Sequence, residues 1–341
     1  MSRVIQRRSI RAFRDSSDLV ASALCLFDVG LFAVTLAVAI QAPNIFVKVI
    51  AALVLGLAIA RLFVLGHDAC HQSLFTNRNL NRWVGRLVFL PSLTPFSLWE
   101  VGHNVGHHVY TNLRGMDYIW TPLSKQEFDA LPRWRQQAER FYRSGWGHGA
   151  YYLIELWWKK LFFASRAQIP NQRGVYTADS LLVLAFGVAW IAALAAAAVA
   201  TQQSITLLVA IGFVLPFIVW NCVMGSVIYF HHTHPLLPWY DDIDRWEAAR
   251  DTGRNTIHVE FQNKLGRILN NIMEHPAHHL DVRIPLYRLE AAQRTLGAGD
   301  MPPQLFSRRL IRDCISHCKL YDYDLSRWTD FEGRPTGPTL S

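Results

Sequence analysis

The sequence predicts an all-α membrane protein with four transmembrane helices in two hairpins and a cytoplasmic cap of histidine-rich helices. Four apolar stretches are long enough to cross the hydrocarbon layer of a bilayer, which takes about 20 residues. Lys and Arg are concentrated outside the turns that would join these stretches in pairs. Charged residues make up 18% of the chain and the mean hydropathy is +0.12, unlike a typical soluble domain. We therefore expect residues 1–341 to form a single integral-membrane domain.

The four expected spans lie at about 19–42, 45–66, 180–200 and 205–230. Residues 1–18 hold five Arg, residues 67–177 hold thirteen Lys and Arg, and residues 231–341 hold fourteen. Because cytoplasmic segments carry an excess of Lys and Arg, both termini and the cap, residues 67–177 and 231–341, are expected in the cytoplasm. The expected membrane is a bacterial inner membrane. The basic residues form no zinc-finger or RNA-binding pattern, so nucleic acid is not an expected partner.

Histidines are strongly clustered, because eleven of the fourteen fall in four short segments. These segments read His67-Asp-Ala-Cys-His71, His103-Asn-Val-Gly-His107-His108, His231-His232-Thr-His234 and His275-Pro-Ala-His278-His279. The first follows the second expected span directly, and the third follows the fourth span. All four clusters therefore lie on the expected cytoplasmic side, at the water boundary of the membrane.

The spacing within each cluster suits metal binding. Side chains three or four residues apart share one face of an α-helix. His67 and His71 are therefore expected to converge on one ion, and the pair His103 and His107 is expected to do the same. Pro276 suits the first position of a helix capped by His275, which would place all three histidines of that cluster on one face.

The number of histidines indicates more than one metal ion. Imidazole suits Zn, Cu, Fe and Ni. Eight or nine ligands exceed the four of a tetrahedral zinc, so two metals with about four histidines each fit better. The expected ligands are His67, His71, His103, His107, His108, His275, His278 and His279, with one of His231, His232 and His234. Candidate acceptors for their other ring nitrogens are Asp68, Glu100, Asp117, Glu274 and Asp281.

The ordered set of clusters resembles the membrane fatty acid desaturase family, whose pattern is H-x3/4-H, H-x2/3-H-H and H/Q-x2/3-H-H around four spans. The likeness covers roughly residues 45–295. It is closest to the acyl-lipid omega-6 and omega-3 (delta-12-type) desaturases. Two stretches carry that closer likeness, His231-His-Thr-His-Pro-Leu-Leu-Pro-Trp-Tyr-Asp-Asp242 and His275-Pro-Ala-His-His-Leu-Asp-Val-Arg-Ile-Pro-Leu-Tyr287. The resemblance implies that His232 is the additional ligand.

The same resemblance implies a function. It implies two non-haem iron ions, O2 as a co-substrate and insertion of a cis double bond into a fatty acyl chain, with no catalytic residue beyond the metal ligands. The acyl group would be linked to lipid, CoA or a carrier. Because no His-Pro-Gly-Gly haem motif occurs, electrons are expected from a separate ferredoxin or cytochrome b5-type protein. Gln72 stands where plant omega-6 members have a second histidine, which leaves the position of the double bond open.

Two other functions compete with desaturation. A hydroxylase, an epoxygenase or a carotenoid ketolase would use the same iron site and add oxygen to its substrate. A non-enzymatic membrane metal or haem protein is the alternative from another class. A transporter would place polar ligands at mid-depth in its spans. The expected spans hold no histidine or acidic residue at their centres, which disfavours a transporter.

Overall fold

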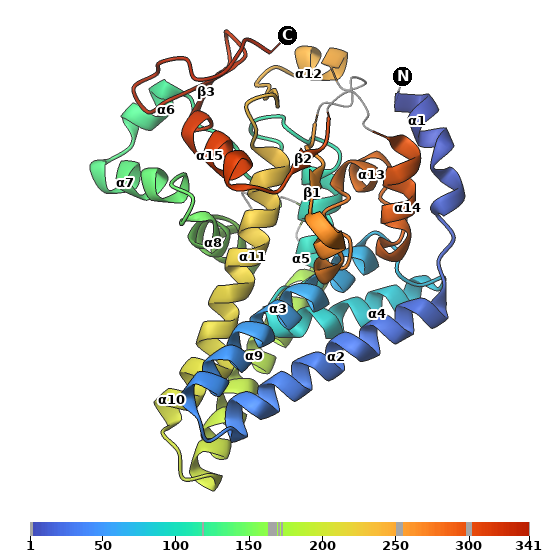
Figure 1. Ribbon diagram of the computed structural model, residues 1–341, viewed down its shortest axis with the longest axis vertical. Coiled ribbons are helices and arrows are strands. Elements are labelled where there is room, and N and C mark those ends of the chain that lie inside the picture. Colours follow the sequence, from blue (N-terminus) through green and yellow to red (C-terminus); the bar gives the residue numbers. More distant parts are fainter. Residues whose placement is uncertain are drawn as a thin grey trace. The chain divides into compact units, whose positions relative to one another are not determined.

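The computed structural model describes residues 3–117, 119–162, 169, 171, 173–249, 255–297 and 302–340 (Figure 1). Contacts divide the chain into two compact units, which are described separately. The membrane unit comprises residues 16–101 and 152–224, and the cap unit comprises residues 1–15, 102–151 and 225–341. Residues 67–101 and 152–177, assigned to the cap from the sequence, thus belong to the membrane unit. A single domain over the whole chain stays a prediction.

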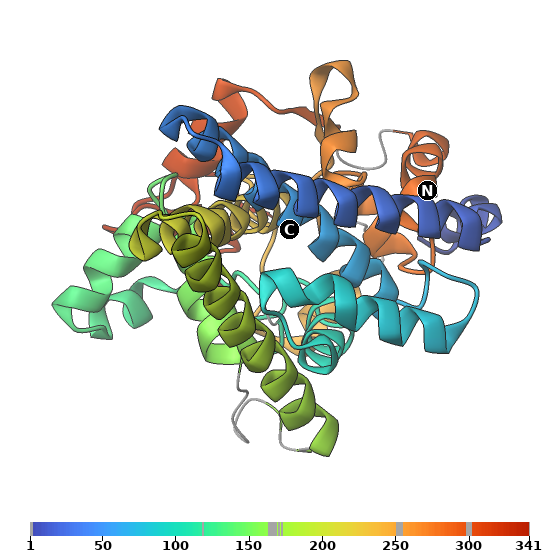
Figure 2. The same cartoon turned by 90° about the horizontal axis from the view of Figure 1, so that it is seen from below.

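Among the described residues, four helices or helical runs are long and apolar enough to cross a membrane, as predicted. They are α2 (Asp18–Gln41), α3 (Ile45–Cys70), α9 (Gly174–Ala200) and the run Ile205–His232. The last comprises α10 (Ile205–Val209), the π-helix η5 (Ala210–Val214) and α11 (Leu215–His232). Figure 2 shows α2 in blue and α9 in yellow-green from below. Helix α3 continues beyond its predicted end into the first histidine cluster, so His67 lies inside the helix and His71 is its C-cap.

Polar side chains cap the starts of three of the four candidate spans. Ser17 accepts a hydrogen bond from the backbone N–H of Val20 at the start of α2. Asn44 accepts one from the backbone N–H of Phe46 at 2.8 Å and is the N-cap of α3, three residues after α2 ends. Ser204 caps α10 in the same way. Such side chains satisfy backbone donors that have no partner within the helix. They explain why the turns fall where the sequence predicts them.

The membrane unit contains a buried ion pair that the sequence did not reveal. Asp28 of α2 is fully buried, and its carboxylate accepts a hydrogen bond from Nε of Arg61 on α3 at 2.6 Å. The expectation that no acidic residue lies near the centre of a span was therefore wrong at Asp28. Because each charge is compensated by the other, the pair ties α2 to α3 and gives no support to a transport site.

The rest of the membrane unit packs beside the spans. Its shorter elements are α4 (Arg78–Phe89), η2 (Leu90–Ser92), α5 (Phe96–Val101) and the π-helix η4 (Tyr152–Phe162). One carboxylate ties several of them together. Asp179 of α9 accepts hydrogen bonds from Nε of Arg86 on α4 and from the backbone N–H of Ser97 on α5. This fixes α5, which leads directly into the second histidine cluster.

The cap unit is mostly helical. Its helices are α1 (Arg3–Ser9), η1 (Arg11–Phe13), the π-helix η3 (Gly102–His107), α6 (Lys125–Ala130), α7 (Arg133–Tyr142), α8 (His148–Tyr151), α12 (Ile243–Ala249), η7 (Gln262–Leu269), α13 (His275–Leu280), α14 (Leu286–Leu296) and α15 (Arg308–His317). Residues 225–232 of α11 also belong to it. Gly225 lets α8 approach closely, since a Cβ atom there would lie 2.3 Å from the carbonyl oxygen of His148.

The described residues are mostly helical, as predicted, but they also form two small sheets that were not predicted. Strands β1 (Val259–Glu260) and β2 (Gln304–Leu305) pair in parallel, and β3 (Leu320–Asp322) and β4 (Arg327–Thr329) pair antiparallel. Alternate aromatic side chains of the second sheet pack inward, where Tyr321 and Trp328 lie against Trp239. Strands of two or three residues are too short to produce a recognisable alternation in the sequence.

Candidate metal centre

Seven of the nine predicted ligands lie in the cap unit, where they form two groups. The trio is His103, His108 and His278, and the tetrad is His107, His232, His275 and His279. Within each group, one ring nitrogen from every histidine lies within 4.8 Å of those of the others. Three segments far apart in sequence supply them: η3 with the residue after it, the end of α11, and α13.

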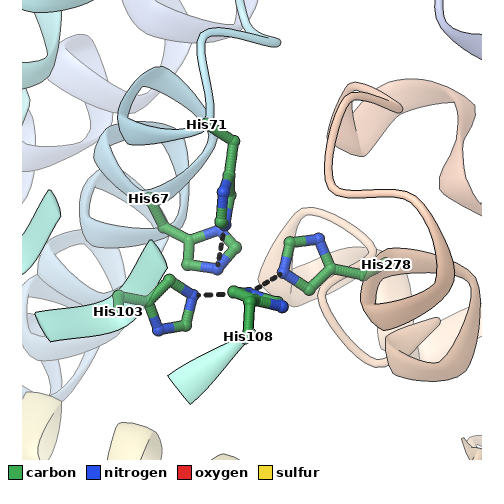
Figure 3. A group of neighbouring side chains, drawn as sticks. All are labelled: His67, His71, His103, His108 and His278. Atoms are coloured by element: carbon green, nitrogen blue, oxygen red, sulfur yellow. Dashed lines mark hydrogen bonds between the residues drawn. The ribbon is translucent and has the colours of Figure 1, made fainter. Parts of the chain in front are cut away.

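The trio is arranged around His108, which follows η3. Its Nε2 lies 3.0 Å from Nε2 of His103 and 3.1 Å from Nε2 of His278. Figure 3 shows the ring of His108 between the other two rings, with these nitrogens directed toward one another. His103 and His278 are buried and His108 is half-buried, so the group is largely shielded from water.

A π-helix decides which histidines of the second cluster meet. The predicted convergence of His103 with His107 was wrong, because His103 joins the trio and His107 joins the tetrad. In a π-helix, hydrogen bonds link residues five apart. The backbone N–H of His108 donates to the carbonyl of His103 at 3.0 Å, which places these two side chains on the same face. His107 is thereby turned toward the tetrad.

The tetrad is the more deeply buried group. Nε2 of His232 lies 2.9 Å from Nε2 of His275, and Nε2 of His279 lies 3.1 Å from His275 and 3.2 Å from His107. Each of the four side chains is buried. Four ring nitrogens from η3, α11 and α13 therefore point at one small region.

Helix α13 supplies both groups from one short element. His275 and His279 are one turn apart and enter the tetrad, while His278 enters the trio. The helix begins one residue earlier than predicted. Glu274 is its N-cap, and Pro276 lies within the first two helical positions. Proline suits this place because its missing N–H would have no helical partner there.

The remaining two predicted ligands lie in the membrane unit. His67, in the last turn of α3, and His71, directly after its end, project from the helix one turn apart (Figure 3). Their Nε2 atoms are 3.4 Å apart and both side chains are buried. This confirms that the first cluster converges as a pair.

Two rings of the tetrad, those of His107 and His279, have neighbours at their other nitrogen that orient them. Nδ1 of His107 donates to Asp117 at 2.9 Å, and that carboxylate also accepts from the backbone N–H of Asn112 at 2.8 Å. Thr111 lies one turn after His107; its hydroxyl bonds the carbonyl of His107 at 2.8 Å and lies 3.4 Å from Nδ1 of His279. Asp117 was among the candidate acceptors. Thr111 was not identified from the sequence as a neighbour of the ligands, although it lies four residues after His107 and so on the same face of a helix.

The other candidate acceptors have different partners. Asp68 lies 3.6 Å from Nδ1 of His67, which is too long for a hydrogen bond. Glu274 bonds His258 at 2.7 Å, and Asp281 bonds Arg14 of the N-terminal segment. Glu100 interacts with Gln72. Of the five candidates, Asp117 has the clearest hydrogen bond to a predicted ligand.

Within the third cluster, the structure separates three adjacent histidines. His232 enters the tetrad, as the family resemblance implied. The ring of His231 stacks on His275 at 4.2 Å, and its Nδ1 donates to the carbonyl of Val227. His234 accepts a hydrogen bond from the backbone N–H of Leu236 and lines a separate cavity of about 620 Å³. In the part of the chain that the structure describes, His148, His258 and His317 also lie outside both groups.

The chemistry of the two groups fits a bound cation. Burial, followed by the effect of neighbouring imidazoles, lowers the pKa of His275 and His279 well below the usual range. Both rings are therefore neutral near pH 7 and each has a lone pair. A hydrogen bond joins only one donor nitrogen to one acceptor nitrogen, so hydrogen bonds among the four rings pair them two at a time. A metal ion can instead accept the lone pairs of all four ring nitrogens of the tetrad. These residues are thus suited to hold metal.

Comparisons with known proteins agree on one family. A family model described as fatty acid desaturase matches residues 43–309. An sn-1 oleoyl-lipid 12-desaturase of Arthrospira platensis is 30% identical over 271 residues, which are 77% of this chain and 73% of that protein. One from Anabaena variabilis is 29% identical, covering 79% and 75%. A chloroplastic omega-6 fatty acid desaturase of Brassica napus is 28% identical over 78% of this chain and 58% of its own length.

Proposed function

The chain belongs to the fatty acid desaturase family, and from this premise we propose that it introduces a cis double bond into the oleoyl chain of a membrane lipid. It is an oxidoreductase, like its named relatives. The observation that carries the proposal is the convergence of seven imidazoles, six of them buried and that of His108 half-buried, into a trio and a tetrad. The oleoyl-lipid substrate is proposed from the names of the relatives.

The proposed metal ligands are nine histidines. The tetrad would hold one iron ion, and the trio would contribute to the site of the other. His67 and His71 complete the proposed set; their own convergence and the family pattern support their inclusion. Three imidazoles leave a metal with open positions, so a larger set is chemically reasonable for the second ion.

Two irons held by imidazole would supply O2-dependent removal of two hydrogens from an unactivated carbon pair. The residues of this chain would orient the metal ligands and keep water away from the reacting groups. Asp117 and Thr111 orient the rings of His107 and His279, whose Nε2 atoms would then be available to hold the metal. Burial of the tetrad excludes water, which would compete with substrate and quench oxidising species. Because the methylenes of an acyl chain are alike, specificity must come from positioning.

Lipid analysis tests this function directly. Expression in a host that lacks the activity should convert part of its oleoyl lipid into a product with two fewer hydrogens. Mass spectrometry after chemical marking of the double bonds would locate the new bond. A product that has gained oxygen would indicate a hydroxylase, epoxygenase or ketolase instead. A Soret band in the purified protein would indicate a haem protein.

Loss of the Asp117 carboxylate should weaken metal binding. In Asp117→Asn the amide cannot accept every hydrogen bond that the carboxylate accepts from His107 and the backbone, so the ring loses its fixed orientation. Removing such an outer partner typically costs about 10- to 100-fold in metal affinity. Competition with an Fe(II) chelator would measure this. Asp313→Asn, on the partly exposed face of α15, is the matched control and should bind iron like the wild type. Equal affinities in both variants would remove Asp117 from the site.

We further propose that both termini and the two histidine groups lie in the cytoplasm, in a bacterial inner membrane. The support is the distribution of Lys and Arg, with five before the first span and fourteen after the last. A separate ferredoxin or cytochrome b5-type protein is the proposed electron donor. Tags on either terminus should be protected from impermeant labels in intact cells, and labelling of both tags would reverse the topology.

A further inference from the structure

The most exposed large apolar residue of the described part of the chain lies in the cap unit. Trp146, in the turn between α7 and α8, is 87% exposed, more than Leu19, which at 81% is the most exposed large apolar residue of the spans. Two further aromatic residues precede it, Trp134 at 72% and Phe141 at 50% exposed. We call these three residues the aromatic edge. Exposed apolar groups of this size in one short segment usually mark an interaction surface.

Helix α7 is built to present this edge. Trp134 and Phe141 are seven residues apart, which places them on one face of the helix, two turns from each other. The opposite face is anchored to the cap unit. Glu139 is buried and pairs with Arg135 at 2.9 Å and with Arg143 at 3.5 Å, and Tyr142 packs against Tyr151. The aromatic edge is therefore held outward by a rigid inner face.

Trp146 is also held in place. The side chain of Ser144 accepts a hydrogen bond from the backbone N–H of Trp146 at 3.3 Å. Gly145 has a φ of +94°, a conformation that favours glycine. Its neighbour Ile315 on α15 fills the space where a side chain would stand. The turn therefore holds the exposed ring of Trp146 in a defined position.

We propose that the aromatic edge inserts into the headgroup region of the lipid bilayer. Tryptophan and phenylalanine flanked by arginine are typical of interfacial helices, because the rings enter the boundary layer and the guanidinium groups reach phosphate. Arg133 at the start of α7 is exposed, and the one acidic residue of the helix, Glu139, is buried and paired. This charge balance matches an anionic lipid surface. Six residues after Trp146, at Tyr152, the chain enters the membrane unit.

We propose lipid as the binding partner of the aromatic edge. Contact with another protein is the alternative that the experiment below distinguishes. The inference depends on the membrane location of the protein and is independent of the iron chemistry proposed above. It can therefore fail while the proposed function holds. The contact would hold the cap unit at the surface from which a lipid-linked acyl chain must enter.

Spin labels in lipid nanodiscs would test the insertion. Of the five cysteines, Cys25 and Cys222 are accessible and would be replaced by alanine, whereas the other three are buried. Single labels are then placed in full-length W134C, F141C and W146C. Leu26→Cys on α2 is the lipid control, since Leu26 is 74% exposed on an apolar span. Arg309→Cys is the aqueous control, since its side chain is 84% exposed on α15.

The ratio of collisions with O2 to collisions with a water-soluble nickel complex reports the depth of each label. We expect the three labels of the aromatic edge to give ratios at least about threefold above the Arg309 control and approaching that of Leu26. Ratios equal to the Arg309 control would overturn the proposal. Labels shielded from both reagents would indicate a protein contact and would overturn it too.

A second measurement uses the unmutated protein, so that its result does not depend on whether the cysteine variants fold. Nanodiscs containing a phosphatidylglycerol analogue with a photoreactive headgroup are irradiated, and the attached lipid is located by mass spectrometry. Attachment should concentrate between residues 133 and 146 and be at least about tenfold lower on α15. Equal attachment at the two sites would contradict the proposed insertion.

Discussion

Replacing His107 by alanine should abolish desaturation while the protein remains folded in the membrane. Nε2 of His107 lies 3.2 Å from Nε2 of His279 at the centre of the tetrad, and Asp117 holds its other nitrogen. Alanine removes one of four proposed ligands from a buried site. Because loss of a mere outer partner costs about 10- to 100-fold, loss of a ligand should lower turnover by more than about 100-fold.

The matched variants separate metal chemistry from folding. His278→Ala removes a member of the trio and should be equally inactive, since two metals acting together leave no partial activity. His317→Ala, a partly buried histidine outside both groups, should keep activity close to that of the wild type. Membrane insertion is followed by carbonate extraction and by size-exclusion profiles in detergent. Retained turnover in His107→Ala or His278→Ala would refute the ligand assignment.

The purified protein should contain two iron ions per chain, and His232→Ala should retain about one. His232 is a member of the tetrad, with its Nε2 2.9 Å from that of His275, so its loss should empty that site first. Neither His232 nor His275 belongs to the trio, so the second metal site should still bind iron. Iron is measured by atomic emission and compared with protein by amino-acid analysis.

His234 provides the matched control for this measurement. It lies two residues further along the chain, faces a separate cavity and belongs to neither group among the described residues. His234→Ala should therefore keep both irons. A single tightly bound zinc in the wild-type protein, or equal iron loss from both variants, would contradict a two-iron centre built on the tetrad and the trio.

Local sequence patterns determined a large part of the site. Side chains four residues apart share a helix face whatever surrounds them, and so the convergence of His67 with His71 was predictable. The family pattern also implied His232, which the residues alone left open among three histidines. The pairing within the second cluster was not predictable, because a π-helix and an α-helix there differ by one residue in register.

The sequence by itself determined the four spans and the identity of the candidate ligands. Length and hydropathy decide whether a segment can cross a bilayer, and the spacing of histidines is a local property. The tertiary structure alone decided how the histidines divide between trio and tetrad, that Thr111 lies beside His279, and that Asp28 meets Arg61. These contacts join segments that lie on different elements. No local periodicity encodes them, since they depend on the packing of whole helices against each other.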